Sequence, residues 1–442
     1  MTRMVSDDTP PRRRSLWRID TSPLRHSRDF RLLFSSGAIS FLGSMFTFVA
    51  VPLQAQQLTG SFVVVGMLGL VEVLPIIVFG LWGGALADHI DRRTLILASE
   101  VGSAICVLLL LANSLLPSPR VWLLFVVGAL FAVADSLQRP SLDALLPQLV
   151  DHDELAGASA LMSLRSSVGF IAGTALGGIV ASYAGVSVAY VIDVATYVAS
   201  FALLWQLPSR GRLSQTKNLP GLLEVKEGLH YAWNRKDLLG TYAIDTLAMV
   251  FAFPWAVFPF VAARFDAPWA LGLLYAASSL GAAAASLTSG WTSQVHRHGR
   301  AIVIAACMYG LAIACFGLAP NLFVALTFLM LSGAADMVSG VFRHLIWNQS
   351  IPDELRGRLA GIELLSYSVG PQLGNARVSL VAQWRGLSAS IASGGILCAA
   401  GVLGLAVALP TMWKYDVRTS PDVANVRNQR ARKSAGDITE SQ

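Results

Sequence analysis

One stretch decides the fold class: FSSGAISFLGSMFTFVAVPL, which runs from Phe34 to Leu53 without a charged residue. A helix needs about 20 apolar residues to cross a hydrocarbon core roughly 30 Å thick. The stretch therefore predicts a membrane-spanning helix. The composition agrees, because 54% of the 442 residues are apolar and only 14% are charged, whereas about 25% of the residues in a soluble domain are charged.

Comparable apolar runs recur along the chain, six before a polar gap and six after it. The first six lie near 33–56, 63–86, 94–115, 121–143, 157–182 and 187–207. The second six lie near 238–262, 269–291, 300–319, 321–346, 358–383 and 388–412. The sequence thus predicts an all-α membrane protein with twelve transmembrane helices.

Most cations outside these runs lie on one side of the predicted membrane. The net charge is +6, yet the loops after odd-numbered spans contain only Arg120, Arg264 and Arg385. Basic loops stay in the cytoplasm, so both termini are expected there, in a multi-pass protein of the cell (inner or plasma) membrane. The same asymmetry explains the basicity without a nucleic-acid partner. The polar ends, residues 1–27 and 418–442, are expected to be mobile.

The second half of the chain repeats landmarks of the first half in the same order. Leu68-Gly69-Leu70 returns as Leu271-Gly272-Leu273, and Asp153-Glu154-Leu155 returns as Asp353-Glu354-Leu355. A constant offset over several landmarks indicates an internal duplication. We therefore expect two pseudo-symmetric six-helix bundles with a binding site between them that opens to each side of the membrane in turn.

The repeat and the polar gap together predict the domain organisation. It comprises a basic arm (1–27), an N-terminal bundle (28–207), a cytoplasmic linker (208–236), a C-terminal bundle (237–413) and a cytoplasmic tail (414–442).

No signature of an enzyme, a metal site or an ATP-driven pump accompanies these spans. None of the five lysines follows a glycine, so the phosphate-binding loop G-x-x-x-x-G-K-[ST] is missing. The four cysteines all fall inside apolar runs, and no histidines have metal-ligand spacing. The sequence predicts a secondary or passive transporter without a cofactor. Its expected partners are a small-molecule substrate, protons and the lipid bilayer, and we expect a monomer.

The loop after the second span has the most specific motif, Gly84-Ala85-Leu86-Ala87-Asp88-His89-Ile90-Asp91-Arg92-Arg93. It resembles the G-x-L-A-D-R-x-G-R-R loop of the major facilitator superfamily, and the resemblance extends over roughly residues 28–413. In that family the loop latches the two bundles together. The resemblance implies this role for Gly84, Asp88, Arg92 and Arg93, with Arg356 and Arg358 as partners before span eleven. The alternative is a solvated turn between helices.

A glycine-rich stretch in span five, Gly173-Thr174-Ala175-Leu176-Gly177-Gly178, is similar to an element of drug–proton antiporters in this superfamily. Its counterpart in span eleven is Gly370-Pro371-Gln372-Leu373-Gly374-Asn375. Small residues allow close helix packing. We therefore assign Gly173, Gly177, Gly178, Gly370, Pro371 and Gly374 to helix packing.

Two further segments resemble the branch that contains enterobactin exporters and macrolide-efflux proteins. The first is Arg139-Pro140 followed by Ala144 to Val150, and the second surrounds Asp245, Pro254 and Phe258-Pro259 in span seven. The resemblance implies proton-driven export of a siderophore or an amphiphilic drug, and it does not choose between these cargoes.

Ionisable residues inside spans need a partner or a watery cavity. Asp245, Glu72 and Asp135, in this order, are our candidates for proton coupling, because the first two have no opposite charge within a turn of their own helix. Their candidate charge partners in the cavity are Arg139, Arg165, Asp336, Arg343 and Glu363. The alternative is that these charges only form salt bridges that make insertion tolerable. Glu100 and Asp193 lie in spans three and six, which pack outside the cavity in the family that the chain resembles.

Aromatic residues near span seven, such as Phe251, Phe253, Trp255 and Phe258, either stack on an aromatic ligand or pack helices together. Two rival functions also stay open. One is an importer or facilitator of a nutrient on the same scaffold, and the other is a membrane receptor or scaffold that transports nothing.

Overall fold

The computed structural model describes residues 20–208, 231, 233 and 235–440, and the side chains at 80–89, 353–366 and 432–440 lie outside this description. Every regular element in the described part is a helix. Eleven helices or helix pairs in this part are long and apolar enough to cross a membrane. Helix α14 (Asp353–Arg385), part of which falls among the undescribed side chains, supplies the twelfth. The predicted fold of twelve membrane helices in two bundles is confirmed.

The N-terminal bundle starts with the short α1 (Ser22–His26) and contains six spans: α2 (Arg28–Thr59), α3 (Phe62–His89), α4 (Arg92–Ser114), α5 (Val121–Leu149), α6 (Leu155–Tyr183) and α7 (Val186–Leu204). The turn η1 (His152–Glu154) precedes α6.

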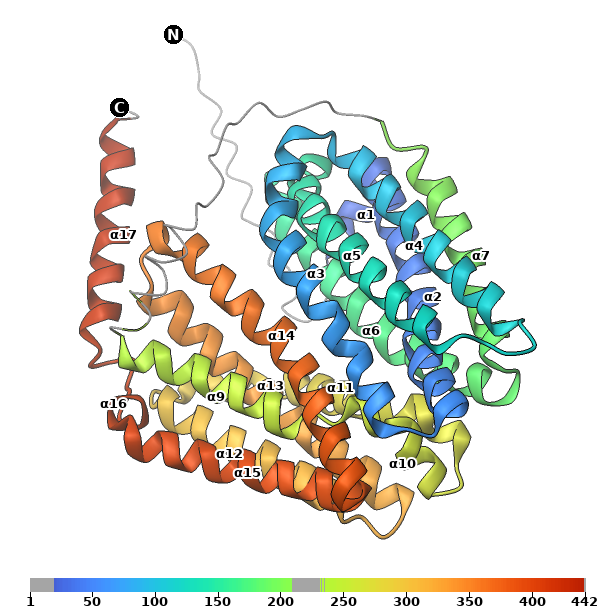
Figure 1. Cartoon of the computed structure of the whole chain (residues 1–442). Coiled ribbons are helices and arrows are strands. Elements are labelled where there is room, and N and C mark those ends of the chain that lie inside the picture. The colour runs from blue at the N-terminus through green and yellow to red at the C-terminus, as the bar shows by residue number, and fades with distance from the viewer. Residues whose placement is uncertain (1–19, 209–230, 232, 234, 441–442) are drawn as a thin grey trace.

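The C-terminal bundle is more broken. Its elements are α9 (Lys236–Ala252), η2 (Trp255–Val257), α10 (Phe258–Arg264), η3 (Pro268–Ala270), α11 (Leu271–Leu287), η4 (Ser289–Gln294), α12 (His298–Gly317), α13 (Leu322–Ser350), α14, α15 (Leu387–Ala408), α16 (Pro410–Trp413) and α17 (Pro421–Glu440). Figure 1 shows the two bundles in contact near α10 and α11 and diverging toward the face that carries α17.

Two glycines show the duplication in the backbone itself. Gly185 precedes α7 with φ 93° and ψ 158°, and Gly386 precedes α15 with φ 84° and ψ 164°. Positive φ is costly for residues with a Cβ, so the same sharp turn requires glycine in both copies. The two positions differ by the offset that separates the other repeated landmarks, which extends the repeat to the last span of each half.

The seventh span is interrupted between Ala252 and Phe258, around Pro254. Backbone groups freed by such a break need partners inside a membrane. Side chains of neighbouring spans provide them: Asn375 accepts from the Ala256 amide (2.9 Å), and the Tyr309 hydroxyl donates to the Ala252 carbonyl (3.0 Å). Arg377 donates to the Phe251 carbonyl (3.2 Å). The Arg377 guanidinium therefore stabilises the interrupted helix.

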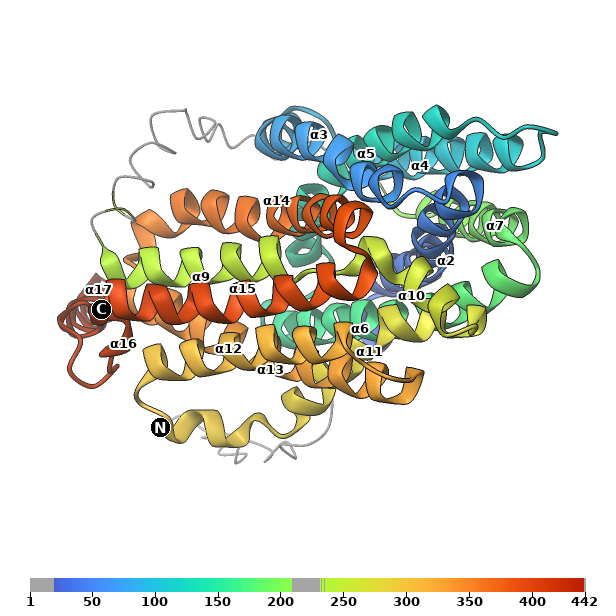
Figure 2. The ribbon, with the colours of Figure 1, turned by 60° about the horizontal axis from the view of Figure 1, so that its bottom comes forward.

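The bundles meet through the glycines of the sequence repeat. A Cβ on Gly69 of α3 would lie 2.0 Å from Oε1 of Gln372 on α14, and a Cβ on Gly272 of α11 would lie 2.2 Å from the Thr174 carbonyl of α6. Each pair joins one span of each half. Seen from the direction of Figure 2, α11 lies beside α6 where the two halves touch. The missing side chains let the backbones approach closely, and we call these two contacts the seam.

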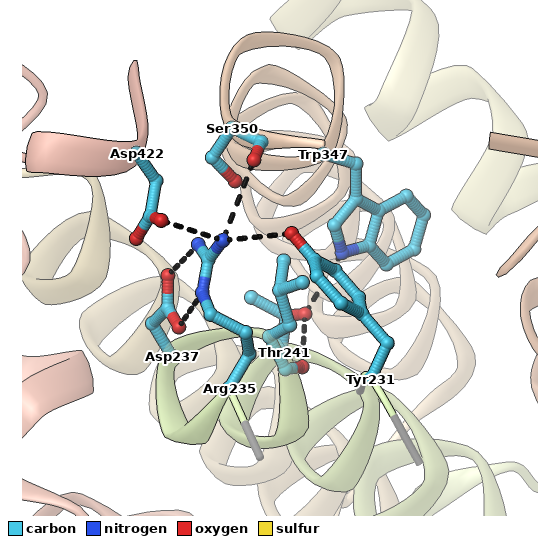
Figure 3. A network of polar contacts seen from close by, with 8 residues as sticks. Tyr231, Arg235, Asp237, Thr241, Trp347, Ser350 and Asp422 are labelled. Atoms are coloured by element: carbon cyan, nitrogen blue, oxygen red, sulfur yellow. Dashed lines mark hydrogen bonds and ion pairs between the residues drawn. The ribbon is translucent and has the colours of Figure 1, made fainter. Parts of the chain in front are cut away.

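The C-terminal segment is helical and attached to the second bundle. Arg235 binds Asp237 through Nε (2.8 Å) and Nη2 (2.5 Å), and its Nη1 lies 3.3 Å from Asp422 at the start of α17 (Figure 3). Burial lowers the pKa of Arg235, but the bonds and charges of Asp237 and Asp422 raise it more, to well above its ordinary value. Val426 of α17 is buried. The tail from 421 to 440 therefore differs from the mobile segment that the composition indicated.

Candidate functional site

Glu72 lies at the seam, where α3 meets α14. Gln372 of α14 donates a hydrogen bond to Oε2 of Glu72 (3.0 Å), so the carboxylate has a partner in the opposite bundle. Asp135 of α5 is a charged neighbour that acts on Glu72. A change in the charge of Glu72 would therefore change the strength of a hydrogen bond between the two halves. Gln372 lies inside the Gly370–Asn375 landmark, but its amide shows no sign in the sequence of a role in this contact.

Asp135 and Arg139 form an ion pair along one face of α5, as their spacing of four residues indicates. Nε of Arg139 lies 2.9 Å from Oδ2 of Asp135, and the two side chains are 63% and 57% exposed. Charges so exposed on a membrane helix are tolerated only where they line a watery space. This face of α5 therefore borders such a space.

Asp245 of α9 pairs with Arg343 of α13, and both side chains are buried. Asp336, on α13 with Arg343, lies 3.8 Å from the same guanidinium and is 41% exposed. The sequence had shown that Asp245 lacks an opposite charge within a turn of its own helix, and the structure supplies one from another span. Two carboxylates of the C-terminal bundle thus share one cation, and one of them is partly exposed.

No ion pair joins Arg165 of α6 to Glu72 or Asp135 in the described part of the chain. The Arg165 guanidinium packs against Gly37 of α2, and the acid that acts on it is Glu100 of α4. Glu100 was expected on a helix outside the cavity, so this pairing was not predicted from the sequence.

Only part of the predicted latch can be placed. Arg92 donates to the Ala144 carbonyl (2.6 Å), and Arg93 donates to the Trp205 carbonyl (2.7 Å), both within the N-terminal bundle. The latch side chains of Gly84, Asp88, Arg356 and Arg358, and the cavity candidate Glu363, lie outside the described residues.

The glycine-rich stretches of spans five and eleven each pack against the first span of their own half. Gly173 and Gly177 lie against α2, the first span of its half, and Gly178 meets Gly272 across the seam. In the second half, Gly370 and Gly374 lie against Met249 of α9, its first span, and Pro371 lies between them inside α14.

A cluster of aromatic rings joins the halves beside the seam. The Trp255 ring centroid lies 5.7 Å from Phe48, 5.5 Å from Phe170 and 5.9 Å from Tyr275. Phe48 and Phe170 belong to the first bundle, and they were missed because the sequence gives no sign that they approach span seven. Trp255, Phe48 and Phe170 are only half-buried, so their ring faces can pack the halves together and also contact a ligand.

Comparison with known proteins agrees with this architecture. Residues 19–436 match the transmembrane secretion effector family, which belongs to the major facilitator superfamily. The chain belongs to this family. It is 28% identical to the enterobactin exporter EntS of Shigella boydii serotype 4 over 393 residues, which cover 88% of this chain and 94% of that protein. The EntS of Citrobacter koseri is 28% identical over 364 residues, 82% of this chain and 87% of that protein.

Solved structures share the fold at low sequence identity. A bacterial homologue of the iron transporter ferroportin, solved in an inward-facing state, has a TM-score of 0.68 at 12% identity and covers 87% of this chain and 98% of its own. The nucleoside transporter NupG has a TM-score of 0.65 at 15% identity, with 88% and 100% covered. This secretion effector is thus a membrane transporter of small molecules and not an enzyme.

Proposed function

We propose that this transporter exports a siderophore-like or amphiphilic drug-like molecule from the cytoplasm in exchange for protons, by alternating access. One observation carries the proposal: the enterobactin exporters are similar over nearly the whole length of both chains. These relatives export enterobactin, and the same direction and a related cargo are assigned to this chain.

Both termini are cytoplasmic in this proposal, as the basic loops indicate. The contacts across the seam then lie toward the outer ends of their spans, because Gly69 lies near the start of α3 and Gly272 near the start of α11. The described halves diverge on the cytoplasmic side (Figure 1). Such a molecule is open to the compartment from which an exporter takes its cargo.

The groups between the halves suit an aromatic and polar cargo. Half-buried Trp255, Phe48 and Phe170 offer ring faces on which an aromatic group can stack. The exposed Asp135–Arg139 pair offers both an acceptor and a donor for polar groups. Coupling is assigned to Asp245, Glu72 and Asp135, whose carboxylates would exchange a proton against cargo.

Proteoliposomes with an imposed pH gradient test this function. Enterobactin and the lipophilic dye ethidium serve as probes, and an acidic lumen should drive a probe inward as protons leave. Glu72→Gln and Asp245→Asn should abolish the response to the gradient, whereas Asp266→Asn, in a loop between spans, should not. Probe movement that ignores the gradient would contradict exchange, movement in the opposite sense would indicate an importer, and binding without movement would indicate a receptor.

A further inference from the structure

Glu100 is an acid that the proposed function does not use, and it lies deep inside the N-terminal bundle. Its residue surface is 3% exposed. The Ser40 hydroxyl of α2 and the Gln138 amide of α5 both donate to Oε1, each at 3.2 Å. Helices α2, α4 and α5 therefore converge on one carboxylate oxygen.

The second oxygen of Glu100 is less well satisfied. Among the described residues Oε2 is buried without a hydrogen bond of standard geometry, and the hydroxyl that interacts with this carboxylate, Oγ of Ser200 on α7, is also buried without one. Buried polar groups are nearly always hydrogen-bonded, because an unpaired one costs about 1–3 kcal/mol. Oε2 is thus a position where the carboxyl group can hold a proton and donate it to the Ser200 hydroxyl.

Arg165 is the cation that acts on this acid, and it too has unused donors. Its Nε and Nη1 are buried without hydrogen-bond partners, and no ion pair joins it to Glu100 in the described structure. The guanidinium has this position because Gly37 leaves room, since a Cβ there would lie 2.0 Å from Nη1. An arginine side chain is long and flexible enough to move from this position toward the acid.

Asp193 of α7 provides a contrast within the same bundle. It is fully buried, yet the Thr47 hydroxyl donates to Oδ2. The single hydroxyl proton of Thr196 is shared between the Asp193 carbonyl (2.7 Å) and Oδ1 (3.4 Å), so both carboxylate oxygens have a hydroxyl partner. Asp193 is a structural acid, whereas Glu100 has an oxygen without a well-formed hydrogen bond and a neighbouring cation with unused donors.

The charges around Glu100 leave Arg165 as its one cationic neighbour among the described residues. Helix α7 presents Asp193, the hydroxyl of Tyr197 and Ser200, and α2 and α5 present the uncharged Ser40 and Gln138. When Glu100 is ionised, its negative charge has no described partner but Arg165, because Asp193 can only repel it.

We propose that Glu100 binds and releases a transported proton, and that the Arg165 guanidinium replaces this proton as the partner of the carboxylate. The inference rests on the proton-coupled function proposed above and adds an acid outside the space between the halves. In one state the proton is bound at Oε2 and Arg165 stays beside Gly37. In the other the proton has left, and the guanidinium moves to the carboxylate and closes the ion pair. The two states therefore differ in the position of the Arg165 charge, which lies beside Gly37 in one state and at Glu100 in the other.

The decisive variant is Glu100→Gln, which keeps the shape and mimics the protonated acid. In proteoliposomes it should still exchange labelled enterobactin across the membrane at equal pH, because exchange needs no net proton transfer. Its response to the pH gradient should be lost. The matched control is Asp193→Asn, a second buried acid of the same bundle, which should retain the response. A full gradient response in Glu100→Gln would overturn the inference.

A measurement without cargo guards against a folding defect. Infrared difference spectra of the purified protein between acid and alkaline pH should contain a carboxyl band that disappears in Glu100→Gln and stays in Asp193→Asn. Gly37→Ala should shift this band, because a Cβ beside the guanidinium pushes Arg165 out of its position, and Arg165→Lys should keep the gradient response in part. An unchanged band in Glu100→Gln would contradict proton binding there.

The two proposals fail in different ways. If the wild type moves no probe with the gradient, the proposed function is wrong. If the wild type is driven by the gradient and Glu100→Gln is equally driven, only the assignment of Glu100 is wrong.

Discussion

Asp245 shows how the partner of a buried charge decides what the residue can do. Its carboxylate contacts a guanidinium from α13, and both groups are withdrawn from water. Removing one member of such a pair takes away much of the compensation for the other buried charge, which is far more costly than the loss of an exposed pair. The same residue is therefore a candidate for coupling and a determinant of stability, and the two roles have to be measured separately.

Asp245→Asn should reduce the free energy of unfolding by about 3–5 kcal/mol, because Arg343 then stays buried without its main partner. The expected loss lies toward the lower end of this range, because the partly exposed carboxylate of Asp336 still lies near the Arg343 guanidinium. Asp135→Asn breaks an exposed pair and should cost less than about 1 kcal/mol. Denaturation of both variants in detergent, followed by tryptophan fluorescence, compares them, and equal losses would show that burial of the Asp245–Arg343 pair contributes nothing.

Residue partners between helices were largely beyond sequence reasoning. The i to i+4 pair of Asp135 and Arg139 could be predicted because a single helix fixes its geometry. The contacts of Asp245 with Arg343, and of Arg165 with Gly37, depend on how each helix is rotated against its neighbours. No pattern within one span records that rotation.

At the scale of elements, the spans and the repeat could be predicted from sequence, whereas the place of the repeated glycines in the seam could not. Apolar length sets each span, and the repeated Gly69 and Gly272 turned out to lie at equivalent contacts between the halves. Helix α17 could not be predicted, because its polar sequence resembles a mobile tail. Its position depends on Arg235, a residue far away in sequence that contacts Asp422 and the Ser350 carbonyl (Figure 3).

Asp422→Asn should loosen α17, because it removes a charge that contacts Arg235 at the start of that helix. Trypsin should then cut at Arg427 and Arg430 faster than in the wild type, since proteolysis follows local opening. Arg385→Gln, at the end of α14 far from α17 in Figure 1, is the control and should leave the cleavage rate unchanged. Cleavage at the wild-type rate in Asp422→Asn would mean that Arg430, which donates to the Asn348 carbonyl (3.1 Å), and the buried Val426 hold the helix without this pair.

At the scale of the whole molecule, alternating access requires that α6 and α11 be in contact at only one of their two ends at a time. At one end the Ser182 hydroxyl donates to the Pro268 carbonyl (2.8 Å), which places α6 and the turn before α11 side by side. At the other end Ser163 and Thr288 are both exposed. If the halves rock as rigid bodies, closing the second end must open the first.

Cysteine pairs introduced into a variant without its four native cysteines measure this exchange. Ser182→Cys with Pro268→Cys should react readily with a short crosslinker in the resting protein, and the crosslink should stop transport because the halves can no longer separate there. Ser163→Cys with Thr288→Cys uses the same two elements and should react only when a pH gradient and enterobactin drive turnover. Both pairs reacting at once, or full transport by the crosslinked Ser182–Pro268 variant, would show that the two ends do not alternate and that cargo crosses the bilayer by another route.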